Sequence, residues 1–118
     1  MTIRDLQDTL AAFAHARDWE QFHTPKNLAM ALAGESGELL EIFQWLTPEQ
    51  STQIMHHPAQ AVRVREEMAD VLAYLLRLAD ILDVDLEQAL AQKIEINGRK
   101  YPVHLARGRA EKYTHLGE

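Results

Sequence analysis

Residues 24–46 read TPKNLAMALAGESGELLEIFQWL, and this stretch predicts a long helix that begins at Thr24-Pro25. A threonine cap followed by proline at the first helical position is a strong helix-start signal. At about 100° per residue, one apolar stripe runs along this helix; its members are Leu28, Leu32, Leu39, Ile42 and Leu46. Glu35 lies near the centre of that stripe and Glu38 at its edge. We expect the helix to end near Trp45 or Leu46.

A second pair of acids, Glu67 and Asp70, lies in another long helix that the periodicity predicts over residues 59–82. One face of this helix is apolar and consists of Val64, Met68, Val71, Leu72, Leu75, Ala79 and Leu82. The two acids lie on a different face, with Tyr74, Leu78 and Ile81. A helix that is apolar on two sides is buried on two sides, and in so short a chain another subunit could supply the second cover.

Helical periodicity recurs in the rest of the chain, and no segment alternates with the period of a strand. A first helix follows Thr2, a connector covers 18–24, and a loop with a short helical insert covers 47–61. A fourth main helix begins after Asp85, and Gly98 and Pro102 mark its end. We therefore predict an all-α bundle of four main helices with a short extra helix. Residues 1–118 are expected to form one domain, with a mobile tail over 103–118.

The composition excludes several classes of protein. A chain of 118 residues with 47% hydrophobic residues can bury a core as one domain. A formal charge of −6 argues against binding to a nucleic-acid polymer. Cysteine is absent, which excludes disulfides and thiolate metal sites. The sequence shows neither an apolar leader nor a membrane span, so a cytoplasmic protein without membrane contact is expected.

The two acid pairs predict a site for a hard divalent cation. Carboxylates three residues apart on a helix repel each other by roughly 3 kcal/mol at an effective dielectric near 20. A single such pair is usually ordinary helix surface, but here two pairs lie in apolar surroundings. Mg²⁺, or Mn²⁺ in its place, prefers oxygen ligands and would remove the repulsion. A di-iron site needs Glu-x-x-His on two helices, and the one match, Glu20-x-x-His23, falls in the connector.

Other residues suggest contacts to a phosphorylated ligand, although each also has a structural interpretation. Lys93 and Asn97 are four residues apart and project from one helix face. They could bind phosphate, or they could simply be solvated side chains near the end of the helix. Trp19 and Trp45 flank the helix that carries the first acid pair, and either could stack on a base or belong to the core. The sequence contains no phosphate loop and no nucleophilic serine motif, so water is the expected attacking group.

Several ordered motifs together resemble one known family over nearly the whole chain. They are Arg17-Asp18-Trp19-Glu20-Gln21-Phe22-His23, Pro25-x-Asn27-Leu28, Gly34-Glu35-Ser36-Gly37-Glu38, Glu66-Glu67-x-x-Asp70, Lys93-x-x-x-Asn97-x-x-x-Tyr101-Pro102 and Lys112-Tyr113. The chain resembles the MazG-like all-α nucleoside triphosphate pyrophosphohydrolases, most closely their dCTP pyrophosphatase branch. The loop over 47–61 has no clear match to the family.

This resemblance implies a helical homodimer or homotetramer that binds Mg²⁺ and a nucleoside triphosphate. It implies metal ligands at Glu35, Glu38, Glu67 and Asp70. Glu38 and Glu35 are also expected to be catalytic, with either a metal ion or a carboxylate such as Glu38 activating the attacking water. It places Lys93, Asn97, Lys100 and Tyr101 at the phosphates. It assigns the base and sugar pocket to Trp19, His23, Trp45 and Tyr74.

The expected activity is cleavage of a nucleoside triphosphate, dCTP or a modified dCTP, to the monophosphate and pyrophosphate, as nucleotide-pool house-cleaning. Preference for cytosine nucleotides rests on the resemblance and on the two tryptophans. One alternative is a hydrolase of dUTP or phosphoribosyl-ATP with the same architecture. Another is a non-catalytic, oligomeric helical interaction protein whose acids are solvated or structural.

Overall fold

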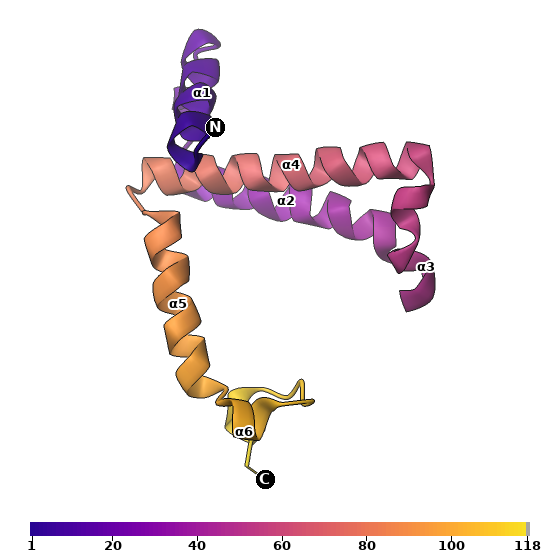
Figure 1. The fold of residues 1–118 in the computed structure, drawn as a ribbon. Helices are drawn as coiled ribbons and strands as arrows, with labels where there is room; N and C mark the ends of the chain where they lie inside the picture. The colour runs from indigo at the N-terminus through magenta and orange to yellow at the C-terminus, as the bar shows by residue number, and fades with distance from the viewer. Residues whose placement is uncertain (118) are drawn as a thin grey trace. The chain divides into compact units, whose positions relative to one another are not determined.

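The computed structural model describes residues 1–117, and this part of the chain is helical with no strand (Figure 1). The four long helices are α1 (Ile3–Ala16), α2 (Pro25–Phe43), α4 (Pro58–Ile81) and α5 (Leu86–Lys100). The short elements are α3 (Pro48–Thr52), α6 (Val103–Ala106) and the 3₁₀ turns Glu20–Phe22, Ile54–His56 and Tyr113–His115. The all-α prediction with four main helices is confirmed.

The chain divides into two compact units, Met1–Asp83 and Val84–Glu118. The first unit contains α1 to α4, and the second contains α5, α6 and the turn Tyr113–His115. That the two units act as one domain, with a mobile tail over 103–118, stays a prediction.

The first unit is built on α2 and α4, which run side by side in opposite directions (Figure 1). Near the C-terminal end of α2, a core cluster joins Ile42, Ile54 and Val64. The partly buried Leu39, Phe43 and Leu46 pack against it. Ile54 belongs to the 47–61 segment, which was predicted as a loop with a helical insert. That segment folds into α3 and a 3₁₀ turn, and it closes this end of the helix pair.

The predicted helix starts are confirmed by their caps. The hydroxyls of Thr2, Thr24 and Thr47 accept hydrogen bonds from backbone N–H groups three residues later, and the carboxylate of Asp85 does the same. Each cap satisfies a donor that the first turn of a helix leaves unpaired. These signals are local in sequence, which is why they can be read without the fold.

Two helix ends differ from the prediction. α2 ends at Phe43, short of Trp45 and Leu46. α5 continues through Gly98 to Lys100, so Gly98 is an interior helical residue and not a terminator. A glycine inside a helix costs about 1 kcal/mol relative to alanine, which neighbouring turns can offset. The stop comes before Pro102, which lacks the N–H that a helix interior needs.

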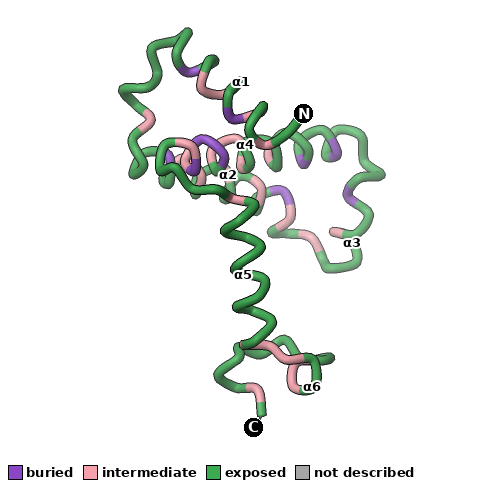
Figure 2. Tube along the Cα trace, turned by 60° about the vertical axis from the view of Figure 1, so that its left-hand side comes forward, coloured by how far each residue is buried: buried purple, intermediate pink, exposed green. Residues whose placement is uncertain are grey.

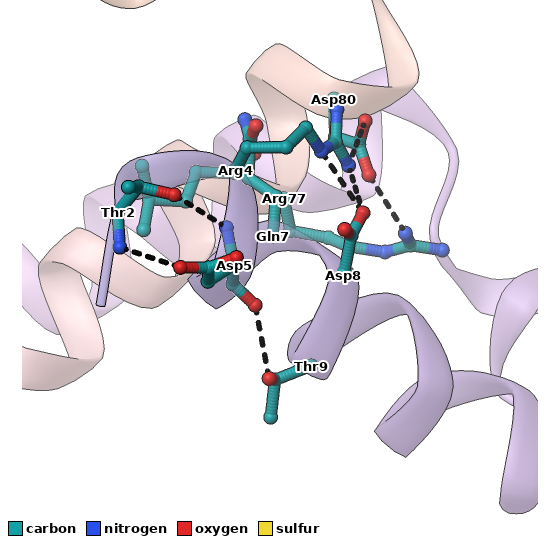
Figure 3. Close-up of polar contacts among 9 residues, drawn as sticks. Thr2, Arg4, Asp5, Gln7, Asp8, Thr9, Arg77 and Asp80 are labelled. Atoms are coloured by element: carbon teal, nitrogen blue, oxygen red, sulfur yellow. Dashed lines mark hydrogen bonds and ion pairs between the residues drawn. The ribbon is translucent and has the colours of Figure 1, made fainter.

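α1 packs on α4 through a buried polar contact and a charged network (Figure 3). The side-chain amide of Gln7, which is buried, donates to the backbone carbonyl of Leu76 over 3.0 Å. Arg4 lies 2.8 Å from the Asp8 carboxylate and 3.0 Å from that of Asp80. These contacts fix the start of α1 against the C-terminal half of α4.

The burial pattern of α4 differs in part from the predicted apolar face (Figure 2). The buried residues of α4 are Ala61, Val64, Leu76, Arg77 and Ala79. In contrast, Met68 and Leu72 of the predicted face are 57% and 47% exposed. Helical periodicity identifies an apolar face but does not reveal which partner covers it, and in this chain α1 and α2 cover other positions. Among the described helices, none is both long and apolar enough to cross a membrane.

Candidate metal and nucleotide site

Three of the predicted acids converge between the two packed helices of the first unit. Glu35 and Glu38 lie one turn apart on α2, and Glu67 lies on α4. Each offers one carboxylate oxygen, and these oxygens lie within 4.8 Å of one another. Two elements that are distant in sequence therefore bring together three negatively charged groups.

Two carboxylate oxygens of this cluster are shielded from water, which disfavours the ionised cluster without a counter-charge. The Oε2 atoms of Glu35 and Glu67 are buried, and neither has a hydrogen-bond partner within residues 1–117. A carboxylate oxygen that is shielded from water and has no partner is unfavourable, and more so when it is charged. Oxygen-only donors of this kind fit a hard divalent cation such as Mg²⁺. The cluster is thus a suitable cation site.

The crowding of these acids raises the pKa values of two of them, Glu35 and Glu67. Burial, followed by the neighbouring carboxylates of Glu38, Glu67 and Asp70, raises the pKa of Glu35 from 4.5 to about 7. Burial and the nearby charges of Glu38 and Asp70 also raise the pKa of Glu67. In both cases the protein disfavours the ionised form, and a bound cation would reverse this preference.

Asp70, the fourth predicted ligand, follows Glu67 by one turn of α4 but is not part of the three-residue cluster. It is close enough for its charge to raise the pKa of Glu35 and of Glu67. Asp70 is exposed, and it lines a cavity together with aromatic residues. Asp70 as a metal ligand stays a prediction.

Two cavities of the first unit share an aromatic lining. One, of about 290 Å³, is lined by Trp19, Phe22, His23, Asn27, Leu28, Ala31 and Tyr74. The other, of about 210 Å³, is lined by Leu10, Phe13, Ala14, Trp19, His23, Asp70, Ala73, Tyr74 and Arg77. Three predicted base-pocket residues, Trp19, His23 and Tyr74, line both cavities. The structure therefore brings these three together and places Asp70 beside them.

The aromatic rings of this wall also contact one another. The rings of Trp19 and His23 lie edge to face, with centroids 6.4 Å apart. The ring of Phe13 in α1 also lies edge to face with that of Trp19, with centroids 5.7 Å apart. The guanidinium of Arg17 lies 3.5 Å from the centre of the Phe13 ring. Trp19 nevertheless remains 43% exposed, so part of its ring is free for a ligand.

Arg77 is a residue of this site that the sequence analysis missed. It is buried on α4, and its Nε donates a hydrogen bond to Nδ1 of His23 over 3.2 Å. Its position was available from spacing, because Asp70, Tyr74 and Arg77 recur at intervals of four and three residues and share a helix face. Spacing alone does not single this residue out, because an arginine on a helix is usually solvated surface.

Trp45 lies at the opposite end of α2 from the aromatic cavities. It follows the last residue of the helix and is 87% exposed, whereas the cavity contacts α2 at Asn27, Leu28 and Ala31. A helix of 19 residues is about 28 Å long. Trp45 therefore does not line these cavities within residues 1–117, and its place in the base pocket stays a prediction.

The predicted phosphate contacts lie in the second unit. Lys93 and Asn97 are exposed one turn apart on α5, as their spacing indicates. Lys100 ends that helix, and its Nζ lies 4.8 Å from the centre of the Tyr113 ring. The rings of Tyr101 and Tyr113 lie 6.0 Å apart. Their roles at the phosphates stay predictions.

An all-α fold in which carboxylates from two packed helices meet, with an aromatic cavity in the same unit, is the arrangement expected of the all-α nucleotide hydrolases. Residues 31–116 match the MazG-like family, and the chain belongs to that family. Over 115 residues the chain is 49% identical to dCTP pyrophosphatase 1 of Bos taurus and 48% identical to that of Homo sapiens. These alignments cover 98% of this chain and 68% of each relative.

A solved structure gives the same result. The crystal structure of a pyrophosphatase from Archaeoglobus fulgidus DSM 4304 matches with a TM-score of 0.79 at 42% sequence identity. The match covers 84% of this chain and 91% of that one. Together with the family match, this similarity identifies the chain as a nucleotide pyrophosphohydrolase.

Proposed function

We propose that the enzyme hydrolyses dCTP, or a modified dCTP, to the monophosphate and pyrophosphate in a reaction that requires Mg²⁺. The observation that carries the proposal is the meeting of Glu35, Glu38 and Glu67 with their oxygens within 4.8 Å of one another. Such a cluster would suit a divalent cation, and magnesium is the usual partner of a triphosphate.

Glu35, Glu38 and Glu67 would hold the cation together with Asp70, with Mn²⁺ as a substitute. When bound, the metal ion would withdraw negative charge from the phosphate oxygens. The fit rests on the buried Oε2 atoms of Glu35 and Glu67, which have no other partner within residues 1–117.

Glu38 and Glu35 would perform the chemistry that the chain itself supplies. Glu38 is the exposed acid of the three, so it is accessible to a water molecule. Its carboxylate would accept a proton as that water attacks phosphorus at the α–β anhydride. A phosphorus–oxygen bond forms to the water oxygen, the anhydride bond breaks, and pyrophosphate leaves. Glu35 would remain ionised in the loaded enzyme and fix the position of its neighbour.

The aromatic cavities would take the base and sugar. Stacking on Trp19 would contribute roughly 1–3 kcal/mol for any base, so it supports nucleotide binding without selecting cytosine. Preference for cytosine is supported by the relatives, which carry the name dCTP pyrophosphatase 1 at 47–49% identity. Tyr74 and His23 would complete the pocket, together with Trp45 of a second copy of the chain, because Trp45 of the same chain lies at the other end of α2.

The basic residues of the second unit would bind the triphosphate. Lys93 and Lys100 supply ammonium groups, and Asn97 and Tyr101 supply neutral donors. The triphosphate carries negative charge next to an acidic cluster, so cationic side chains are needed to balance it.

A homodimer or homotetramer would cover the apolar surface that one chain leaves exposed. Met68 and Leu72 on α4 and Leu40 on α2 are 57%, 47% and 62% exposed. Association through such residues is favourable because it removes apolar surface from water.

A panel of nucleotides with Mg²⁺, read out as pyrophosphate release, tests this function. We expect kcat/KM to be highest for dCTP and modified dCTP. Similar values for all common nucleotides would indicate a general house-cleaning enzyme. A preference for dUTP or phosphoribosyl-ATP would indicate the related hydrolases of this architecture. No release from any nucleotide would refute the proposal in favour of a non-catalytic helical protein.

A further inference from the structure

We propose that Arg77 is a positioning residue that fixes His23 as a hydrogen-bond donor toward the nucleotide base. This inference rests on the proposed function of the aromatic cavities as a base pocket. It concerns the protonation site of one imidazole ring, which can be measured without any turnover.

The hydrogen bond between the two residues defines which ring nitrogen carries the proton. Nε of Arg77 lies 3.2 Å from Nδ1 of His23. Arginine in proteins is always protonated and can only donate, so Nδ1 must be the acceptor. The single proton of a neutral imidazole then resides on Nε2. Within residues 1–117, no side chain or backbone group pairs with Nε2 of His23.

The surroundings favour the neutral ring. Burial and then the positive charge of Arg77 lower the pKa of His23 below 6.5, while the carboxylate of Glu20 opposes this shift. A ring that was protonated on both nitrogens would place a second donor against the guanidinium. The Nε2–H form is therefore the expected state at neutral pH.

Arg77 is itself held from the other side. Its side chain is 9% exposed, and Nη1 lies 3.7 Å from a carboxylate oxygen of Asp80. Asp80 in turn pairs with Arg4 of α1 at 3.0 Å (Figure 3). A buried guanidinium between an acid and a ring nitrogen has little freedom, because breaking either contact would leave a buried charge without its partner.

The consequence lies at the wall shared by the two cavities. His23 lines both of them together with Trp19 and Tyr74. A fixed Nε2–H offers one donor to a ligand there, and this donor complements an acceptor on a base edge. Cytosine presents two such acceptors, its carbonyl oxygen and its unprotonated ring nitrogen. Stacking on Trp19 would hold the base, and His23 would orient it.

Two-bond ¹H–¹⁵N correlation spectra of the free, full-length protein test the protonation site directly. We expect His23 to be the Nε2–H tautomer in the wild type and to lose that fixed state in Arg77→Met. Arg63→Met, on an exposed position of the same helix, is the matched control and should leave the His23 signals unchanged. A wild-type ring protonated on Nδ1, or a tautomer unchanged in a folded Arg77→Met, would overturn the inference.

Kinetics with dCTP then test the role in binding. We expect Arg77→Met to raise KM roughly tenfold, with a smaller change in kcat, because one hydrogen bond in the base pocket is weakened. In a His23→Ala background, Arg77→Met should raise KM no further if Arg77 acts through His23. Arg77→Lys keeps the positive charge and is a second variant. If its spectra show His23 as the Nε2–H tautomer, its KM should be close to that of the wild type; if they do not, its KM should be raised as in Arg77→Met.

These results separate the two proposals. A wild-type protein that releases no pyrophosphate refutes the proposed function while the tautomer is still measured. An active wild type in which Arg77→Met raises KM equally with and without His23 refutes the positioning role alone.

Discussion

The carboxylates of Glu35 on α2 and Glu67 on α4 each contribute an oxygen to a cluster within 4.8 Å, and the buried Oε2 atom of each has no hydrogen-bond partner within residues 1–117. Helix packing thus holds together two carboxylates that repel each other when both are ionised. The packing energy of the first unit maintains an arrangement that electrostatics disfavours. Electrostatic repulsion of this kind is typical of functional sites, where a bound ligand of opposite charge would remove it.

Replacing Glu35 by glutamine should abolish metal-dependent turnover without unfolding the protein. We expect pyrophosphate release to fall by about 100-fold or more, because even residues behind metal ligands commonly contribute 10–100-fold. The melting temperature of the metal-free protein should stay the same or rise, since a neutral amide removes a buried negative charge.

Glu41→Gln is the matched control for this variant, because Glu41 lies on the same helix but is exposed. It should retain both activity and stability. Full activity in Glu35→Gln would show that this cluster does not hold the cation needed for turnover.

Cation binding should weaken as the pH falls below about 7, where Glu35 becomes protonated in the metal-free protein. The apparent Mg²⁺ affinity should drop by up to about tenfold per pH unit, because the proton and the cation compete for the same oxygens. Isothermal titration calorimetry of Mg²⁺ binding in two buffers of different ionisation enthalpy would measure the number of protons released on binding. Affinity independent of pH between 6 and 8 would contradict the raised pKa.

The same group should make the metal-free protein less stable as the pH rises. The pKa of Glu35 is raised from 4.5 to about 7, so between these values the folded chain holds a proton that the unfolded chain has lost. Its contribution to the free energy of unfolding is therefore largest below the ordinary value and is lost as the pH rises through 7. Urea unfolding at several pH values, with Glu35→Gln as the reference, would isolate this contribution.

Removing the Trp19 ring should weaken nucleotide binding more than it slows chemistry. We expect Trp19→Ala to raise KM by roughly 5–150-fold, which corresponds to a stacking energy of about 1–3 kcal/mol. An unchanged KM would exclude the aromatic cavities as the base pocket.

Trp45→Ala provides an informative comparison, because Trp45 lies at the other end of α2. If it raises KM as Trp19→Ala does, a second copy of the chain must bring its own Trp45 to the pocket. Binding of nucleotide should then depend on protein concentration in the range where the oligomer dissociates.

Loss of the Gln7 side-chain donor should destabilise the junction of α1 and α4. Gln7→Leu has a similar volume but cannot donate to the carbonyl of Leu76, and we expect the free energy of unfolding to fall by about 1–3 kcal/mol. Asp8→Asn, which alters only an exposed pair with Arg4, should have little effect. Equal stability of Gln7→Leu and wild type in urea would show that this contact is not needed.

The sequence predicts those parts of the fold and site that depend on neighbouring residues. The caps at Thr2, Thr24 and Asp85 and the alignment of Glu35 with Glu38 follow from local geometry. The meeting of these acids with Glu67 was predicted because both pairs interrupt apolar stripes, and the structure confirms that three of the four acids converge.

Contacts between elements that are distant in the sequence cannot be predicted from such local patterns. Arg77 and His23 are brought together by the packing of α4 against the turn before α2. Nor could periodicity show that Leu76 is buried while Leu72 is exposed, because that difference depends on where α1 crosses α4. Trp45 is predicted to join Trp19 because both flank the helix that carries Glu35 and because the family resemblance places both in the base pocket, but a helix of 19 residues separates them within one chain.

The location of the cation is the most direct measurement. Crystals grown with Mn²⁺ and a non-hydrolysable dCTP analogue would reveal the metal ion by its anomalous scattering. We predict a peak between α2 and α4, coordinated by Glu35, Glu38 and Glu67, with Asp70 and phosphate oxygens completing the shell. A peak held by other residues, or nucleotide bound with no metal at these carboxylates in an enzyme that turns over, would contradict the account.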